Sequence, residues 1–528
     1  MRTSGTHQTG IDPASLQLLI SRLSGIADEM GAVLRRGSFS PNIKERADCS
    51  AAVFTPDGEM LAQAEHIPVH LGSMPASVLA AIASPAGQAI RPGEQIVLND
   101  PHNGGTHLND VTIVAPVFTG ESATDELVGW VANRAHHADV GGAAPGSIPP
   151  DARDIVQEGL VVPPVLLTDD VVALFAANSR TGTERVRDLT AQRGANTIGA
   201  ARLAALAGAP FGDVLAHGER RMRAALEELP NGLYGFDDVM DSTGAGDDQR
   251  EPAAVIVAVT LDGDAICFDF TGSAPQSDGN VNAVRAVTES AVAFALRVAT
   301  DPGIPANGGA MRPVDVVAPD GTIIAAQPPT PVGAGNVEVS QRVADVCLGA
   351  LAQAVPERVP AASQGTMNNV LIGGRDPRGG EFVFYETIAG GQGGRPGRAG
   401  MSGVHTNMTN TRNTPVEALE RDFPVRVRRY SLRRSSGGDG EFPGGDGVER
   451  DLEVLEAVTL SLVTERRVSA PYGLNGGGAG ATGENWLLPG GDETRGERLP
   501  DKCTVHLDAG DVIRILTPGG GGHGPGRA

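Results

Sequence analysis

Lysine is almost absent from this 528-residue chain, which has only Lys44 and Lys502 among its 42 basic residues. Neither lysine stands in a Gly-Lys-Ser/Thr sequence, so the chain has no P-loop for a nucleotide phosphate. The basic residues are outnumbered by 64 acidic ones, which gives a net charge of -22. Because phosphate backbones bind to basic faces, this balance argues against nucleic acid or an anionic membrane as the principal partner.

Cysteine is also scarce, and the 4 cysteines are far apart with no Cys-x-x-Cys pair among them. A disulfide framework or a cysteine zinc ribbon is therefore not supported, and a reducing compartment is expected. No run approaches the roughly 20 apolar residues that cross a bilayer, and the first residues are polar, without the apolar core of a signal peptide. We therefore expect a cytoplasmic protein with no membrane partner.

The length exceeds what a single hydrophobic core usually organises, so several domains are expected. Apolar residues at helical spacing predict helices over residues 13–35 and through most of 184–229, whereas residues 253–261 and 265–270 predict a strand hairpin. We predict a mixed α/β (α+β) multidomain fold. Its expected parts are an N-terminal α/β metal-site domain (1–230), a central α/β domain (231–388) and a C-terminal domain of glycine-rich loops and β-strands (389–528).

Glycine, in contrast, is abundant, with 71 residues that become dense after position 390. Arginine, asparagine and aromatic residues are interleaved with these glycines, which favours ordered loops over a flexible Gly/Ser linker. Residues 478–483 match G-x-G-x-x-G, but they follow a loop instead of a strand, so we reject a dinucleotide site. The glycines of 390–394, beside the polar residues of 406–410, could hold a ligand through backbone amides, although a structural loop explains them as well.

Six of the eleven histidines lie close together in the first third of the chain: His66, His70, His102, His107, His136 and His137. His102, His107 and Asp110 occupy a glycine-rich turn just before an apolar, β-branched run, and His136, His137 and Asp139 end the next such run. Imidazole together with carboxylate is a ligand set that divalent metals accept. The sequence therefore predicts a metal site at strand ends.

His107 and Asp110 can converge within one turn, and His136 ends a strand that we expect beside residues 111–117. Two imidazoles and a carboxylate leave positions open for water or substrate, as in catalytic metal sites. Asp48, at the mouth of an earlier strand, is a sensible fourth ligand or a turn residue. His137 should point to the opposite face of the sheet. Histidines near turns also serve as hydrogen-bonding structural residues, so spacing alone leaves both interpretations open.

Motifs along nearly the whole chain resemble, in the right order, those of the hydantoinase B/5-oxoprolinase family. They lie at residues 46–50, 67–74, 99–110, 136–142, 145–147, 158–160, 279–283, 415–417 and 435–438. The resemblance implies that the ligands of a divalent metal (zinc, manganese or iron) map onto Asp48, His107, Asp110 and His136. It also implies a hetero-oligomer with an A-type subunit, an actin-like ATPase that binds ATP and phosphorylates the carbonyl oxygen of the substrate.

The function implied is that of the B-type subunit of an ATP-dependent hydrolase of cyclic amides such as hydantoin, 5-oxoproline or a lactam. The metal would activate water for attack on the phosphorylated carbonyl, and His137 and Asp139 are the candidates for moving protons. Two other functions stay open: a subunit of an ATP-dependent ketone carboxylase, and a non-catalytic scaffold for the A-type ATPase. A neighbouring gene for a third, small subunit would favour the carboxylase.

Overall fold

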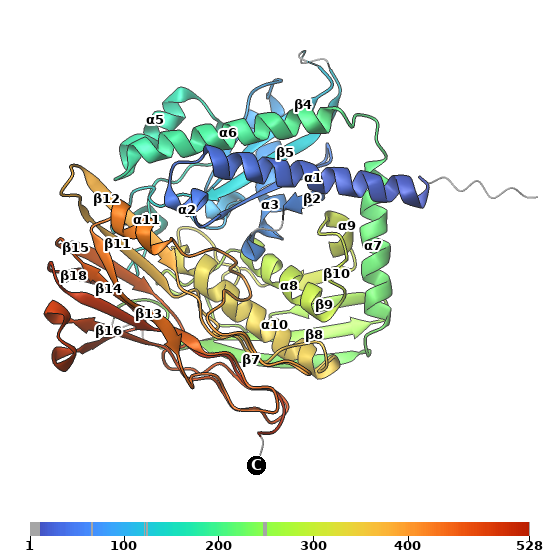
Figure 1. Cartoon of the computed structure of the whole chain (residues 1–528). Helices are drawn as coiled ribbons and strands as arrows, with labels where there is room; N and C mark the ends of the chain where they lie inside the picture. Colours follow the sequence, from blue (N-terminus) through green and yellow to red (C-terminus); the bar gives the residue numbers. More distant parts are fainter. Residues whose placement is uncertain (1–10, 65–66, 121, 123–124, 247–250, 527–528) are drawn as a thin grey trace, which may run out of the picture.

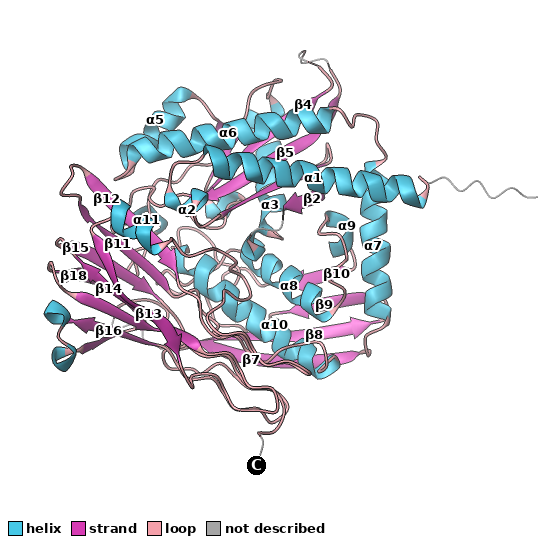
Figure 2. Cartoon of the chain, in the orientation of Figure 1, coloured by secondary structure: helices cyan, strands magenta, loops and turns pink. Residues whose placement is uncertain are grey.

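The computed structural model describes residues 11–64, 67–120, 122, 125–246 and 251–526, so that His66 of the histidine cluster lies outside the described residues. Within this part the strands form four sheets, and helices cover two of them (Figures 1 and 2). The mixed α/β fold predicted from the sequence is thereby confirmed. Among the described helices, none has the length and apolar character needed to cross a membrane.

The first sheet has the strand order β2-β1-β5-β4-β3-β6, with every neighbouring pair antiparallel. Its strands are β1 (Cys49–Phe54), β2 (Met60–Ala64), β3 (Ile96–Leu98), β4 (Asp110–Phe118), β5 (Leu127–His136) and β6 (Val165–Leu166). The strands β1, β2 and β3 are buried along their whole length. Apolar residues on both faces of a strand require a cover on both sides.

Two long helices, α1 (Pro13–Gly37) and α6 (Gly182–Ala204), lie side by side on one face of this sheet (Figure 1). The helix predicted over 13–35 is thus confirmed, and the carboxylate of Asp12 caps its start by accepting from two backbone N–H groups. The opposite face packs on α3 (Ser73–Ala83). Alternate strand residues divide between the two covers: Val53 belongs to the cluster with α1, and Phe54 to the cluster with α3.

The second sheet has the order β10-β9-β8-β7, with only the β9–β10 pair parallel. Its strands are β7 (Gly232–Met240), β8 (Ala253–Asp262), β9 (Ala265–Asp269) and β10 (Val314–Val317), which confirms the predicted hairpin. The helices α8 (Arg285–Ala299) and α10 (Ser340–Ala354) pack on each other, and α10 also packs on β7 and β8. Because α3 contacts α8, the two helix-covered sheets share one large core.

The remaining two sheets face each other across an apolar core that includes Ile372, Phe384, Leu452, Leu460 and Ile513. One sheet comprises β11 (Asn369–Arg375), β12 (Glu381–Thr387), β15 (Val458–Val463) and β18 (Lys502–Leu507). The other comprises β13 (Val425–Arg433), β14 (Gly447–Val454), β16 (Glu484–Leu488), β17 (Glu497–Leu499) and β19 (Val512–Leu516). β11 and β12 thus precede the boundary expected near residue 388, and the three domain ranges stay predictions.

The remaining elements connect these layers. The helices are α2 (Pro41–Lys44), α4 (Pro85–Gln88), α5 (Asp169–Asn178), α7 (Phe211–Glu227), α9 (Gly308–Met311) and α11 (Val416–Asp422). The single turns are η1 (Pro68–His70), η2 (Pro101–Asn103), η3 (Ile155–Gln157), η6 (Pro489–Gly491) and η7 (Glu493–Arg495), and the π-helical turn η5 (Gly335–Val339) leads into α10. Two of these turns, η1 and η5, hold residues of the candidate site described below.

The glycine-rich segments of the C-terminal part pack against one another through their backbones. The amide of Gly520 donates to Gly445 O at 2.9 Å, and the amide of Gly445 donates to Gln392 O at 2.8 Å. A Cβ on Gly520 would lie only 2.1 Å from Gln392 O. These contacts confirm the prediction of ordered loops, and the glycines serve here to let backbones approach closely.

Candidate metal centre

Strand pairing brings the predicted ligands together. Asp110 is the first residue of β4 and His136 is the last residue of β5, and the two are direct partners in the antiparallel register. His107 lies in the turn that leads into β4. The adjacency of these strands, expected from the sequence, is confirmed, and all three residues are at most 3% exposed.

The three side chains aim their ligand atoms at one point. His107 Nε2 lies 3.1 Å from His136 Nδ1, and both nitrogens lie within 3.5 Å of Asp110 Oδ1. Their ligand atoms all fall within 4.8 Å of one another, which suits a bound metal ion. Two neutral imidazoles that face each other can share only one proton, whereas a cation between them would satisfy both nitrogens and the carboxylate. The donor set therefore fits a divalent metal.

Burial and the contacts within the group together set the protonation states that metal binding needs. It lowers the pKa of His136 to about 3, despite the hydrogen bond with Asp110, so the imidazole is neutral and keeps a free electron pair. Burial alone would raise the pKa of Asp110, but the electrostatic interaction with His107 and hydrogen bonds with His107, His136 and His70 bring it well below its usual value. A neutral imidazole beside an ionised carboxylate is a ready ligand pair.

The turn that carries His107 is held by Asn99. The Asn99 amide nitrogen donates to Leu108 O at 2.8 Å and to Leu160 O at 2.9 Å, and its oxygen accepts from the amide of Val162 at 2.7 Å. Gly104 has φ near 92°, and a Cβ there would lie 2.6 Å from the side chain of Ala80. The glycine is needed because a larger residue would force the turn away from α3.

The second oxygen of Asp110 is held by three side chains. It accepts from Thr106 Oγ1 at 2.7 Å and from Asn336 Nδ2, on the π-helical turn, at 3.4 Å, and it lies 3.4 Å from His70 Nε2. The other ring nitrogen of His70 is 2.8 Å from Ser50 Oγ. Such contacts orient a ligating carboxylate. In the sequence, His70 is one of the clustered histidines with no assigned role, and Asn336 carries no signal of a role at this site.

The C-terminal sheets close the site from the other side. The ring of Tyr385, from β12, stacks on His136 with centroids 4.6 Å apart, and its hydroxyl donates to Asn369 Oδ1 at 2.9 Å. The guanidinium of Arg46 lies over the same ring at 4.7 Å and donates to Tyr385 O at 2.8 Å. A buried aromatic stack of this kind fixes the imidazole plane and keeps water away from it.

Asp48 lies beside this group but outside the three whose ligand atoms converge. Its backbone oxygen accepts from the amide of His136 at 3.0 Å, and its carboxylate is 3.8 Å from the guanidinium of Arg46. Burial raises the pKa of Asp48 to about 6, although Arg46 opposes the rise and Asp110 adds to it. A cation in the site would favour the ionised form of this carboxyl group.

The other expected residues point elsewhere. His137 lies on the α6 side of the sheet, as the strand pleat required, with Nε2 donating to Gln192 Oε1 at 2.9 Å. The carboxylate of Asp139 accepts from the amides of Gly141, Gly146 and Arg180 and from the guanidinium of Arg180. His102 donates to Thr330 O at 3.0 Å. The geometry therefore gives Asp139 and His102 contacts typical of loop supports.

Several known proteins are similar to this chain over nearly its whole length. The family model for hydantoinase B/oxoprolinase matches residues 12–526. An uncharacterized protein of Methanocaldococcus jannaschii is 41% identical over 97% of this chain and 91% of its own. 5-oxoprolinase 1 of Arabidopsis thaliana is 39% identical over 97% of this chain, which spans only 42% of that protein. The B-type subunit of a putative D-/L-hydantoinase from a Pseudomonas species is 32% identical, with 97% and 90% coverage.

Solved structures show the same fold. The ATP-dependent caprolactamase of Pseudomonas jessenii superposes with a TM-score of 0.89 and 29% identity, covering 98% of this chain and 91% of the other. An acetone carboxylase has a TM-score of 0.88 at 18% identity, with 97% and 76% coverage, a likeness that concerns the fold alone. Because the family match extends over nearly the whole chain, the chain belongs to the hydantoinase B/oxoprolinase family.

Proposed function

We propose that this chain is the metal-binding, B-type part of an ATP-dependent hydrolase that opens cyclic amides. The observation that carries the proposal is the buried His107–Asp110–His136 group, whose ligand atoms converge within a chain of the hydantoinase B/oxoprolinase family. We propose Asp48 as the fourth ligand, because its carboxyl group is buried beside His107 and Asp110. The substrate class is supported by relatives named 5-oxoprolinase, hydantoinase and caprolactamase.

A divalent metal bound here, such as zinc, manganese or iron, would polarise a carbonyl group and make a nearby water more acidic. The surrounding residues prepare the site for that chemistry. Thr106 and His70 hold the outer oxygen of Asp110, so that its inner oxygen faces the two imidazoles. Tyr385 fixes the ring of His136. A substrate carbonyl that reached the metal would meet ligands that need no rearrangement.

His137 and Asp139 keep a part in the proposal as positioning residues. His137 joins the end of β5 to α6 through Gln192, and the amide nitrogen of Gln192 donates in turn to Val111 O at 2.9 Å. The carboxylate of Asp139 accepts hydrogen bonds from the amides of Gly141 and Gly146, in one loop, and from the amide of Arg180. Both residues follow His136 closely in sequence, so we propose that they hold this ligand in place.

The ATP-using step belongs, in this proposal, to a separate A-type subunit. The two lysines offer no P-loop, and the relatives include one named as part of a hydantoinase with several subunits and one described as an ATP-dependent caprolactamase. The part of 5-oxoprolinase 1 outside the 42% matched here is long enough to supply such an activity within one chain. We therefore propose a hetero-oligomer with an A-type partner.

A test is to co-express the chain with an A-type subunit of the same family and to assay hydantoin, 5-oxoproline and caprolactam with and without ATP. The proposal expects ring opening of at least one of them only when ATP and both subunits are present. An acetone panel with bicarbonate is the second arm, because the fold is shared with an acetone carboxylase. Carboxylation of the ketone without any ring opening would show that the chain acts in a ketone carboxylase and not in a hydrolase. Normal ATP hydrolysis after replacement of the metal ligands would indicate that the chain is a scaffold.

A further inference from the structure

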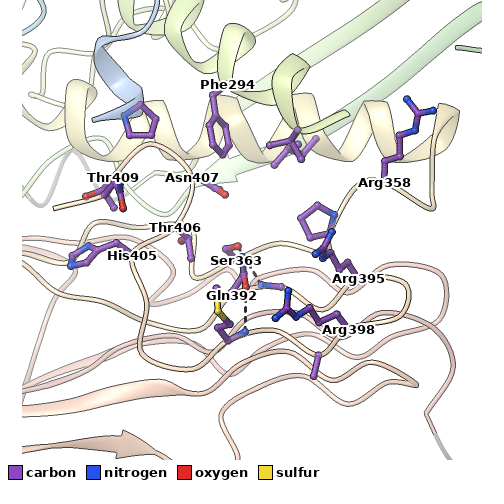
Figure 3. A pocket seen from close by; sticks show the side chains of 18 residues that line it. Phe294, Arg358, Ser363, Gln392, Arg395, Arg398, His405, Thr406, Asn407 and Thr409 are labelled. Carbon is purple, nitrogen blue, oxygen red and sulfur yellow. Dashed lines mark hydrogen bonds between the residues drawn. The ribbon is translucent and has the colours of Figure 1, made fainter. Parts of the chain in front are cut away.

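A cavity of about 440 Å³ lies between the helices of the second sheet and the glycine-rich loops (Figure 3). Phe294 and Leu348 form its apolar wall, and polar residues of the loops at 392–401 and 405–410 form the opposite side. The volume is in the range of pockets that hold small organic ligands. This cavity is lined by none of the metal-centre residues described above.

The charge of the cavity is unusual for this chain. Arg358, Arg395 and Arg398 line it, and Figure 3 shows them gathered at one end, away from His405 and Thr409. Among the described residues that line the cavity there is no aspartate or glutamate. Arg358 lies 3.7 Å from carboxylate oxygens of Glu228 and Glu357, so the local positive field in this protein of net charge -22 comes mainly from Arg395 and Arg398.

Arg395 and Arg398 are held side by side by the backbone. The amide of Arg395 donates to Arg398 O at 3.0 Å and the amide of Arg398 donates to Arg395 O at 2.9 Å, which forms an isolated β-bridge. Like charges directly opposite each other across a bridge are destabilising. Elsewhere on the surface, arginines such as Arg428 pair with carboxylates of their own sheet, here Glu453 at 2.7 Å. Within the described chain, no carboxylate forms an ion pair with Arg395 or Arg398.

The far side of the cavity offers hydrogen-bonding groups that the protein leaves unused. Thr406 and Thr409 are 6% and 3% exposed, and the hydroxyl of each has no hydrogen-bond partner among the described protein atoms. A buried hydroxyl without a partner costs free energy. A ligand that accepts a hydrogen bond from it would therefore be bound more tightly. The guanidinium groups at one end of the cavity suit an oxyanion, and the hydroxyls of Thr406 and Thr409 suit another hydrogen-bond acceptor of the same molecule.

The cavity is adjacent to the metal centre through one short connection. The amide of Val69 donates to Met408 O at 3.3 Å, which ties η1 to the cavity segment. Pro68, at the start of η1, lines the cavity, and His70, at its end, touches Asp110. A ligand in the cavity would therefore contact the same turn that supports the metal ligand.

We infer that this cavity is an oxyanion-binding site that takes the carboxylate or phosphate group of a small organic molecule. Guanidinium groups bind both kinds of oxyanion through charge-assisted hydrogen bonds. The identity of the ligand rests on the proposed function, since 5-oxoproline carries a carboxylate and an ATP-dependent partner supplies phosphate. The binding itself rests on the residues of the cavity.

The experiment is calorimetric titration of the full chain with inorganic phosphate and, separately, with 5-oxoproline at low ionic strength. The double variant Arg395→Gln/Arg398→Gln should weaken binding by about ten-fold or more, because two charge-assisted contacts are lost. Arg495→Gln/Arg498→Gln is the matched control: both arginines are exposed, stand three residues apart like the first pair, and lie outside the cavity. It should bind as the unaltered chain does.

Binding of 5-oxoproline alone would identify a substrate carboxylate, and binding of phosphate alone a phosphate group; either result supports the site. The inference is overturned if the unaltered chain binds neither anion, if the Arg395/Arg398 variant binds as tightly as before, or if the control loses as much. A chain that opens rings yet binds neither anion contradicts this inference alone. A chain that binds through these arginines but never opens a ring contradicts only the proposed function.

Discussion

At the scale of single residues, Asp110 organises the candidate centre, because one of its oxygens faces two imidazoles while the other is held by Thr106, Asn336 and His70. An aspartate held by so many groups has little freedom to move when a cation binds. The support by His70 is the contact that is simplest to remove without touching a proposed ligand.

Replacing His70 by alanine should weaken metal affinity by about 10–100-fold, the usual effect of losing a residue that orients a ligand. The measurement is competition between the purified chain and a chelator of known affinity. His102→Ala is the control, since His102 donates to Thr330 O instead of approaching Asp110. Equal affinities in the two variants would mean that His70 does not orient the carboxylate.

The sequence could predict His107, Asp110 and His136 because they end or precede strands with a clear apolar pattern. It could not assign His70, which lies on the three-residue turn η1, where no periodicity indicates the direction of a side chain. The expectation that His137 points to the opposite face of the sheet followed from the two-residue repeat of a strand. From the sequence, Asp139 is equally suited to proton transfer, because the residues next to it in the chain do not indicate that four donors surround its carboxylate.

At the scale of elements, the packed glycine loops should be sensitive to substitution. Gly520→Ala would place a Cβ at 2.1 Å from Gln392 O, so the backbones must separate. We expect a loss of about 1–3 kcal/mol in the free energy of unfolding, as for overpacked cores. The control Gly194→Ala, in α6 with open space around it, should be neutral or stabilising. Thermal denaturation compares the two, and equal melting temperatures would show that the loops can yield.

The order of these loops was predictable because aromatic, arginine and asparagine residues alternate with the glycines. Their mutual packing was not, since it joins segments at 392, 445 and 520 that are far apart in the chain. The strands, by contrast, were predicted within a few residues, for example β8 and β9. Alternation is a local signal, whereas contact between distant loops is settled only by the complete fold.

At the scale of the whole molecule, the centre is assembled from parts that lie hundreds of positions apart. Tyr385 stacks on His136, Asn336 reaches Asp110, and Arg46 donates to Tyr385 O. Single-sequence patterns carry no information on such long-range contacts, which explains why Tyr385 and Asn336 were not expected. Their presence makes the site depend on the docking of the C-terminal sheets and the π-helical turn.

One buried acid makes this docking sensitive to pH. The carboxyl group of Glu158 accepts from the amides of Val332 and Gly333, just before the π-helical turn, and burial raises its pKa to about 8. The folded state therefore favours the protonated acid. Its contribution to stability is complete below about pH 4.5, the value without burial, and is lost as the pH rises toward 8.

The melting temperature of the unaltered chain should fall between pH 5 and 8. Ionisation of Glu158 should lower the free energy of unfolding by at most about 1.4 kcal/mol per pH unit. Glu158→Gln removes the ionisation and should show a shallower decline. The variant Glu497→Gln, on an exposed stretch of β17, should follow the unaltered chain. Parallel curves for Glu158→Gln and the unaltered chain would rule out this contribution.

His107, Asp110 and His136 are proposed to hold a divalent metal needed for ATP-dependent ring opening. The most direct measurement is the metal content of the purified complex, compared among the unaltered chain, His107→Ala and Asp110→Asn, with turnover recorded on the same samples. We predict stoichiometric metal in the unaltered chain and loss of both metal and turnover in each variant. Full metal content with full ATP-dependent turnover in both variants would contradict the account.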